Sequence, residues 1–298
     1  MAQKTAIQWT DYTSNPIRAR HKVTGKVGHA CIKVSDGCKN CYAERMNRWR
    51  GTGEPFTPAG MANVELFMDD AEMRKLETFK PRGPFKAGGT RAMVFPFDMT
   101  DLFQDAVPSS WIQRFFNVVE KRRNIIWQVL TKRPARAYLE LRAFGRKLPN
   151  LWLGTSIENQ DVEHFRTYDL REIHDLVGLL FLSIEPLLGP VNLGCDLIGM
   201  SWVIVGGESG CGARECQIDW VRLIRDRCLV TGVAFFMKQV GRSILSTVKE
   251  DFGHPDNRFF DAPLQLYRYR VADSHGGNPE EWPEDLRVRE WPKVTSAA

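Results

Sequence analysis

The sequence lacks the marks of a membrane protein and of a secreted one. No apolar run approaches the roughly 20 residues that a membrane-spanning helix requires. The opening segment, MAQKTAIQWTDYTSNP, is polar and does not resemble a charged-then-apolar leader. We therefore predict a soluble, cytoplasmic protein that has no membrane partner.

Cysteine is scarce, and the common motifs for nucleotide phosphates are absent. The chain has seven cysteines among 298 residues, an odd and low number that argues against a disulfide framework. The glycine-rich segment GGESGCG at 206–212 matches neither a P-loop nor a dinucleotide-binding fingerprint. Repeats and low-complexity stretches are also lacking, and the apolar content of 43% is ordinary for a globular protein with its own core.

Three of the cysteines, Cys31, Cys38 and Cys41, lie close together in the segment CIKVSDGCKNC. Thiolates crowded in this way repel one another unless a metal neutralises them. A structural zinc site is closed by four protein ligands, whereas an iron–sulfur cube held by three cysteines leaves one iron open. S-Adenosylmethionine (SAM) can chelate such an iron through its amino and carboxylate groups. The cysteines therefore favour a 4Fe-4S cluster whose open iron can bind a small molecule such as SAM.

A zinc site is the alternative interpretation, because His21 and His29 lie near the cysteines in the sequence. Either imidazole can complete a four-ligand zinc site. Such a protein would be a non-catalytic, zinc-stabilised module that binds nucleic acid.

Six nearly continuous apolar runs predict strands that are covered on both faces, as in a parallel sheet. Their starts are about 23 to 33 residues apart, which suits strand–helix–strand units. The predicted fold class is α/β, a partial (β/α)6-type TIM barrel. The runs are residues 92–97, 125–130, 151–157, 178–184, 201–207 and 233–239.

Two of the intervening helices carry end signals. One is predicted to begin with a capping box formed by Ser110 and Gln113. The other, at 218–232, is predicted to begin with Asp219 as its cap and to stop at Gly232.

The rhythm of strands and helices also predicts the domains. Residues 1–245 are expected to form the barrel, with an insertion or long loop at about 50–90 that is rich in glycine and proline. Residues 246–298 lose the rhythm and are predicted to be a C-terminal appendage packed on the barrel.

Polar side chains follow every predicted strand. In a parallel barrel the carboxyl ends of the strands converge on one rim, where active sites lie. We expect the cysteine segment on the same rim, because it follows a segment that can form the first strand. The rim residues are Asp98, Thr100, Asp101, Thr131, Lys132, Arg133, Ser156, Glu158, Ser183, Glu185, Glu208, Ser209, Lys238 and Gln239.

Positive charge is concentrated in two segments. Residues 1–50 hold ten Lys and Arg against three Asp and Glu, and residues 121–147 hold nine against one. Solvated helix surfaces carry similar charge, but two basic tracts can also form one face for a polyanion. Nucleic acid (DNA) or a nucleotide is therefore the predicted substrate class.

An ordered set of motifs spans nearly the whole chain and resembles a known family. The motifs are IQWTDYTSNP, CIKVSDGCKNCYAERM, DMTDLF, VLTKRP, LWLGTSIEN, LSIEPLLGP, WVIVGGESG, FFMKQVG and GGNPEEWPEDLRVREWP. The set resembles a phage- and prophage-associated three-cysteine family that is grouped with the radical SAM superfamily. Two features depart from the usual patterns: six residues instead of three separate the first two cysteines, and the basic segment IRARHKVTGKVGHA precedes them.

The resemblance implies roles for the rim residues. Radical SAM enzymes commonly bind the methionine amino group with a Gly-Gly-Glu after the second strand, and DMTD stands at that place here. The implied cofactor-binding residues are Asp98, Thr100, Asp101, Thr131, Ser156, Glu158 and Glu185, and the implied catalytic residues are Lys132, Glu208 and Lys238.

The resemblance also implies an activity. SAM would be cleaved to a 5′-deoxyadenosyl radical that abstracts hydrogen from the substrate, with an external electron donor such as flavodoxin or ferredoxin. The leading substrate hypothesis is a modified thymine base in phage DNA, which would be rearranged in an isomerase or lyase type of reaction. The protein would then be encoded by a phage or prophage in a bacterial host.

Overall fold

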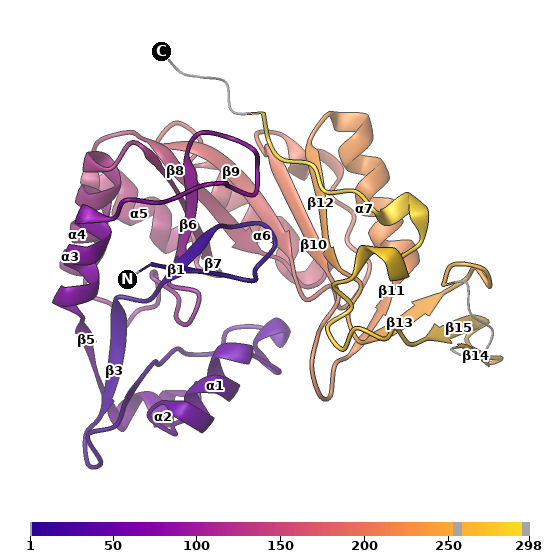
Figure 1. The fold of residues 1–298 in the computed structure, drawn as a ribbon, viewed down its shortest axis with the longest axis horizontal. Coiled ribbons are helices and arrows are strands. Elements are labelled where there is room, and N and C mark those ends of the chain that lie inside the picture. Colours follow the sequence, from indigo (N-terminus) through magenta and orange to yellow (C-terminus); the bar gives the residue numbers. More distant parts are fainter. Residues whose placement is uncertain (1, 253–257, 294–298) are drawn as a thin grey trace. The chain divides into compact units, whose positions relative to one another are not determined.

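The computed structural model describes residues 2–252 and 258–293 (Figure 1). Its largest sheet has eight strands in the order β1-β2-β6-β7-β8-β9-β10-β12. Pairing is parallel between β2 and β6, β6 and β7, β7 and β8, β9 and β10, and β10 and β12, whereas β1 is an antiparallel edge strand. The strands are β1 (Gln3–Lys4), β2 (Tyr12–Ser14), β6 (Ala92–Pro96), β7 (Ile125–Thr131), β8 (Leu148–Ser156), β9 (Val177–Ile184), β10 (Trp202–Gly206) and β12 (Ala234–Gln239).

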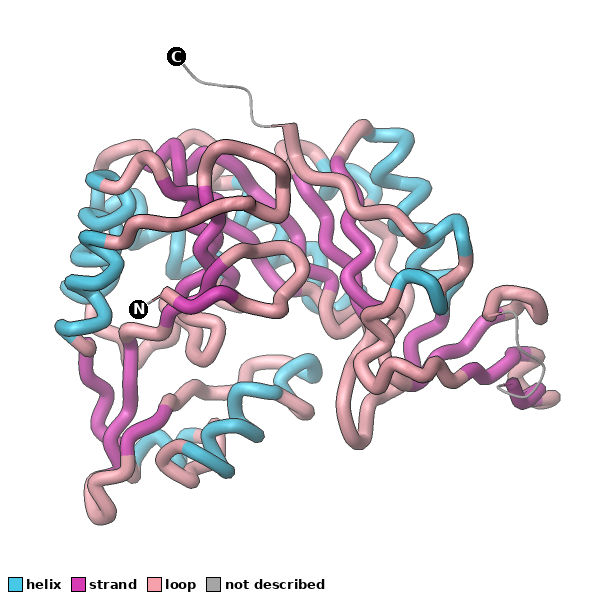
Figure 2. The backbone as a smooth tube through the Cα atoms, viewed as in Figure 1, coloured by secondary structure: helices cyan, strands magenta, loops and turns pink. Residues whose placement is uncertain are grey.

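All six predicted strands are present, so the α/β class is confirmed, and the open strand order is compatible with a partial barrel. Figure 2 shows helices alternating with these strands along the chain. Helix α4 (Ser109–Lys121) follows β6, α5 (Pro134–Phe144) follows β7, α6 (Gln160–Arg171) follows β8, and α7 (Ile218–Thr231) precedes β12. A short 3-10 helix, η2 (Gly194–Leu197), lies between β9 and β10.

The predicted helix ends are partly wrong. Helix α4 begins at Ser109, directly after the extended Pro108, and no side chain caps it. Ser110 therefore lies inside the first turn, and the predicted capping box does not form. In α7, Asp219 likewise lies in the first turn rather than at the cap, whereas Gly232 ends the helix in the left-handed conformation as predicted.

The predicted long loop at 50–90 contains regular structure. Thr57 caps α2 (Pro58–Ala62), and Asp69 caps α3 (Asp70–Thr78) by accepting from two backbone N–H groups. Between them, β5 (Val64–Met68) pairs with β3 (Ile17–His21). The basic segment before the first cysteine forms the hairpin of β3 and β4 (Val27–Gly28), so these strands make a three-stranded sheet.

A third sheet has the order β11-β13-β15-β14. It combines β11 (Glu215–Gln217) with β13, which spans the predicted boundary near residue 245, and with β14 and β15 of the predicted appendage; two 3-10 turns follow it in the chain. These elements are β13 (Ser243–Ser246), β14 (Arg258–Asp261), β15 (Leu266–Tyr269), η4 (Pro279–Glu281) and η5 (Glu284–Leu286).

The chain divides into two compact units, each with its own aromatic core. The first holds the described residues within Met1–Thr155 and Asp169–Leu180, and the second those within Ser156–Tyr168 and Phe181–Ala298. The predicted boundary near residue 245 stays a prediction.

In the first unit, Phe115 of α4 packs edge-on against Phe97 and Trp127, with ring centroids 5.0 and 5.7 Å apart. In the second, Trp202 of β10 packs against Trp291 at 5.3 Å. Burial of a large apolar side chain stabilises a fold by about 1.5–3 kcal/mol, so Trp291 secures the C-terminal segment to its own unit. Among the described residues, no helix combines the length and apolar character needed to cross a membrane.

Candidate metal centre

The three clustered cysteines lie on one loop of the first unit, which we call the cysteine loop (residues 29–41). Cys31 follows β4, Cys38 ends the 3-10 helix η1 (Asp36–Cys38), and Cys41 is the N-cap of α1 (Tyr42–Arg50). All three thiols are free and partly buried. Three potential sulfur ligands therefore stand on one short segment that leads into a helix.

Polar side chains from distant elements hold the backbone on both sides of Cys31. Before it, the Ala30 carbonyl accepts hydrogen bonds from Thr100 Oγ1 at 2.6 Å and from Gln104 Nε2 at 3.0 Å. After it, the Ile32 carbonyl accepts one from Arg133 Nη2 at 3.0 Å. The loops after β6 and β7 thus fix the position of the first cysteine.

Helix α1 holds the same segment with its buried polar face. Asn47 Oδ1 accepts from the backbone N–H of His29 at 2.9 Å, and Glu44 pairs with Lys33 at 2.5 Å. The backbone at Gly28 approaches Asn47 so closely that a Cβ atom there would lie 2.3 Å from Asn47 Oδ1. The loop therefore fits against α1 only with glycine at this position.

Asp101 connects these contacts. Its Oδ1 accepts hydrogen bonds from Thr131 Oγ1 at 2.8 Å and from the Phe103 N–H at 2.9 Å. Its Oδ2 accepts from the Lys132 N–H at 3.0 Å and from Arg133 Nη1 at 3.1 Å. Both oxygens are thus engaged, and the carboxylate orients the arginine that holds the cysteine loop.

Asp98 reaches the loop from the same direction. Its Oδ2 accepts from the Tyr42 hydroxyl at 3.0 Å, and its Oδ1 accepts from Asn15 Nδ2 at 2.6 Å. Burial raises the pKa of Asp98, although both hydrogen bonds oppose this effect. Because Tyr42 directly follows Cys41, this carboxylate lies beside the start of α1.

Burial also governs the thiols. It raises the pKa of Cys31 to about 12, with the charge of Asp101 as the next cause and Arg133 acting in the opposite sense. Burial raises the pKa of Cys41 as well, against hydrogen bonds from the backbone of Glu44 and Ala43. The thiols of Cys31 and Cys41 therefore hold their protons until a metal displaces them, and metal binding releases these protons.

The sulfur atoms of Cys31, Cys38 and Cys41 do not all lie within 4.8 Å of one another. Within residues 2–252 and 258–293, one group of three or more His, Cys, Asp or Glu ligand atoms lies wholly within 4.8 Å, and it contains no cysteine. Thiolates around one zinc ion are about 4 Å apart, as the Zn–S bond length and tetrahedral geometry require. In an iron–sulfur cluster each thiolate binds a different iron, so the sulfurs are further apart.

Of the two histidines of the zinc interpretation, His21 is engaged through both ring nitrogens and His29 through Nδ1. His21 Nε2 contacts Glu54 Oε1 at 3.1 Å, and its Nδ1 accepts from the N–H groups of Val23 and Thr24. His29 Nδ1 contacts the Ile17 carbonyl at 3.2 Å. Burial, with the charge of Arg18 as a second cause, lowers the pKa of His29 to about 4.

The remaining predicted site residues lie in the second unit, where some of them meet. Lys238 Nζ is 2.9 Å from Glu185 Oε1, and Ser183 Oγ donates to Glu185 Oε2 at 3.1 Å. Gln239 Nε2 donates to the Gly207 carbonyl at 2.8 Å. The ends of β9 and β12 thus bring a lysine, a carboxylate and a hydroxyl together.

Two other predicted carboxylates in this unit are held by arginines. Glu208 is bound by Arg214, whose Nη2 and Nε lie 2.5 and 2.9 Å from its two oxygens. Glu158 pairs with Arg166 at 2.9 Å, with side chains only 1% and 3% exposed. Ser156 contributes its carbonyl, which accepts from the same Arg166 nitrogen at 2.8 Å. These contacts support the local backbone.

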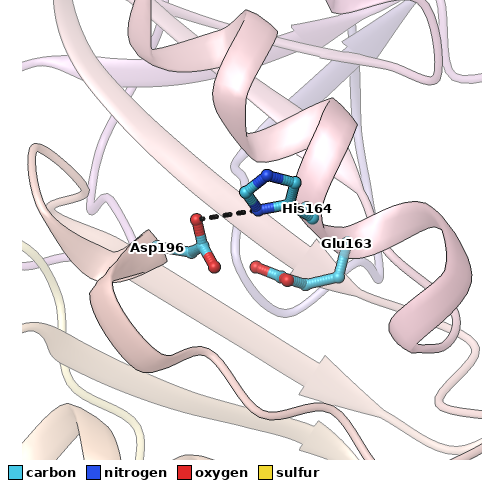
Figure 3. Close-up of side chains that lie close together, drawn as sticks. All are labelled: Glu163, His164 and Asp196. Atoms are coloured by element: carbon cyan, nitrogen blue, oxygen red, sulfur yellow. Dashed lines mark ion pairs between the residues drawn. The ribbon is translucent and has the colours of Figure 1, made fainter.

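A cluster that the sequence reasoning missed lies in the second unit. Glu163 and His164 on α6 and Asp196 on η2 bring one ligand atom each within 4.8 Å (Figure 3). His164 Nδ1 lies 3.8 Å from Asp196 Oδ1. Asp196 is 32 residues beyond His164 in the chain, and no spacing rule links them. Acidic groups of this kind are common without a bound ion.

We expect Glu163 to make stability depend on pH. Burial, and then the charge of Asp196, raise its pKa to about 7 from an ordinary 4.5. Between these values the folded chain holds a proton that the unfolded chain has released. The contribution of Glu163 to the free energy of unfolding is therefore largest below pH 4.5 and should fall by on the order of 2 kcal/mol as pH rises to about 8.

Urea denaturation at several pH values measures this decline. Glu163→Gln should flatten it, because the amide does not titrate. Asp161→Asn, an exposed change on the same helix, should keep the wild-type slope. An equally steep decline in the Glu163→Gln variant would assign the pH dependence to other groups.

Fold and site together define an α/β protein with a candidate three-cysteine metal centre. The chain matches the family model described as a protein of unknown function (DUF5131) over residues 4–262. Because the match covers most of the chain, the protein belongs to the DUF5131 family. Comparison with curated proteins gives no match, and comparison with solved structures gives none. The family description assigns no activity, so the function must be argued from the site.

Proposed function

We propose that this protein is a radical SAM enzyme that acts on nucleic acid or a nucleotide. The observation that carries the proposal is the cysteine loop. Three thiols stand on a loop that hydrogen bonds hold on both sides of Cys31, and their sulfurs do not all lie within 4.8 Å of one another. Cys31, Cys38 and Cys41 would hold a 4Fe-4S cluster with one open iron. When bound at such a cluster, SAM would supply 5′-deoxyadenosyl radical chemistry, with the electron coming from the external donor by way of the cluster.

The hydrogen bonds of the loop after β6 refine the predicted cofactor-binding roles of Asp98, Thr100 and Asp101. Thr100 donates to Ala30, and all four hydrogen bonds to Asp101 come from its own unit. Both residues therefore act by positioning the loop. Asp98 is the better candidate for the methionine amino group, because its carboxylate adjoins Tyr42 next to Cys41. A buried carboxylate favours a cationic partner.

Residues of the second unit supply candidates for the substrate side. Lys238 and Glu185 form a half-buried pair that can exchange its partners when a polar ligand arrives. Glu208 is bound on both oxygens by Arg214, so a role in proton transfer would require that pair to open. Lys132 stays a candidate for a carboxylate or phosphate.

The substrate proposal rests on charge and on the family resemblance. Residues 1–50 and 121–147 carry net charges of +7 and +8, as ten bases against three acids and nine against one give. Rearrangement of a modified thymine base in phage DNA is the leading reaction, with flavodoxin or ferredoxin as electron donor. A cytoplasmic, phage-encoded protein belongs to the same proposal.

Anaerobic reconstitution tests the proposal. After incubation with iron and sulfide, the brown protein should hold about four of each ion per chain. With SAM and dithionite it should then release 5′-deoxyadenosine, which mass spectrometry detects. Colourless protein that holds one zinc ion and leaves SAM intact would contradict the proposal and favour the zinc-stabilised module.

A further inference from the structure

The solvent face of α1 has an unusual composition. Tyr42, Arg45, Met46 and Trp49 recur at the spacing of one helical face, and all four are exposed. The buried face of the same helix carries the polar Glu44 and Asn47. An amphipathic surface helix normally shows the reverse arrangement.

Polar contacts explain why α1 has polar residues on its buried face. Glu44 accepts from the Phe56 N–H at 3.0 Å and pairs with Lys33, and Asn47 accepts from the His29 N–H. These contacts secure the cysteine loop, so the inner face serves the metal centre. Met46 and Trp49 on the outer face take no part in these contacts, and large exposed apolar side chains mark interaction sites.

Charge on this face identifies the kind of partner. Arg45, Arg48 and Arg50 are exposed, and α1 exposes no acid, because its single acid, Glu44, is buried. Within residues 2–252 and 258–293, none of the three arginines forms an ion pair. The face is therefore complementary to a polyanion.

Trp49 identifies the ligand further. Its side chain is 73% exposed, and the Arg50 guanidinium lies 3.8 Å from the ring centroid. The arginine lies over one face of the indole and places positive charge beside the exposed part of the ring. Exposed aromatic rings interspersed with arginines are the means by which proteins bind unpaired bases.

We propose that this basic aromatic face of α1, formed by Tyr42, Arg45, Met46, Arg48, Trp49 and Arg50, binds single-stranded nucleic acid with a base stacked on Trp49. The inference rests on the proposed nucleic-acid substrate. Chemistry on a base requires that the base leave the duplex stack. Since α1 begins at Cys41, the face would hold an unpaired strand on the helix that leads out of the metal centre.

Fluorescence anisotropy tests the proposal with labelled oligodeoxythymidine and a duplex of equal length. The reconstituted full chain should bind the single strand more tightly than the duplex. Trp49→Ala should weaken single-strand binding about tenfold, as loss of one stacked base does. Phe165→Ala, an exposed aromatic change on α6, should have no effect.

The salt dependence gives a second measurement. The double change Arg45→Gln and Arg48→Gln should lower the slope of log affinity against log salt by about 1.4, from two lost phosphate contacts. Arg227→Gln on α7 removes an exposed charge elsewhere and should leave the slope unchanged.

Equal affinity of wild type and Trp49→Ala for the single strand would overturn the proposal. If the same variant instead slowed reduction of the cluster by flavodoxin, the face would be a docking site for an acidic electron donor. Binding is measured without SAM or reductant. If the strand does not bind to α1 but the wild type still cleaves SAM, only the binding proposal is contradicted, and the enzymatic proposal is unaffected.

Discussion

Cys38→Ala should abolish iron retention and lower the rate of 5′-deoxyadenosine release by more than about 100-fold, because loss of a mere supporting partner of a metal ligand already costs 10- to 100-fold. The chain should nevertheless fold. The sulfur of Cys38 has one weak contact, with Ser35 Oγ at 3.9 Å, and its backbone N–H keeps its bond to the Ser35 carbonyl. Iron analysis, the SAM assay and the thermal midpoint give the three readouts.

The matched control is Cys211→Ala. Cys211 is an exposed free thiol in the second unit, outside the cysteine loop. This variant should keep iron content and SAM cleavage at wild-type levels. The reading of the cysteines fails if Cys38→Ala retains full iron and activity, or if it unfolds with loss of one bound zinc.

The strands were predictable because burial on both faces requires a run of apolar residues, which is visible in the sequence. Each of β6 to β10 and β12 is nearly continuous in apolar residues, as strands covered on both faces must be. The helices within 50–90 were missed because they are short and lie between glycines and prolines. Their signals were the single caps Thr57 and Asp69, which turns use equally often.

Of the candidate metal centre, only the three cysteines were predictable. Cysteine spacing is visible in the sequence, but the supporting contacts join residues far apart. Gln104 reaches Ala30 across 74 positions, and Arg133 reaches Ile32 across 101. Both side chains donate to backbone carbonyls. Every residue has a backbone carbonyl, so no sequence pattern marks these contacts. The sequence also indicated polar residues at the strand ends. It did not indicate which of them hold the cysteine loop, because that depends on their hydrogen bonds in the fold.

Asp101→Ala should destabilise the first unit by about 3 kcal/mol, because removal of one partner from a buried pair leaves the other uncompensated. The side chains of Asp101 and Arg133 are only 10% and 13% exposed. Four donors lose their acceptor, among them the Arg133 side chain that holds the Ile32 carbonyl. We expect iron to dissociate about 10- to 100-fold more readily, as when partners that orient metal ligands are removed.

Two variants distinguish a role of Asp101 in orienting the cysteine loop from a role only in stabilising the first unit. Asp101→Asn keeps the shape but turns one oxygen into a donor that faces the Lys132 N–H and Arg133, so it should retain iron almost as poorly as the alanine variant. Asp105→Ala changes an exposed acid in the same loop and should alter neither property. Urea unfolding and the rate of iron loss to a chelator measure both effects. Full iron retention by Asp101→Asn would mean that the carboxylate does not position the first cysteine, whereas iron loss without unfolding would assign it that role.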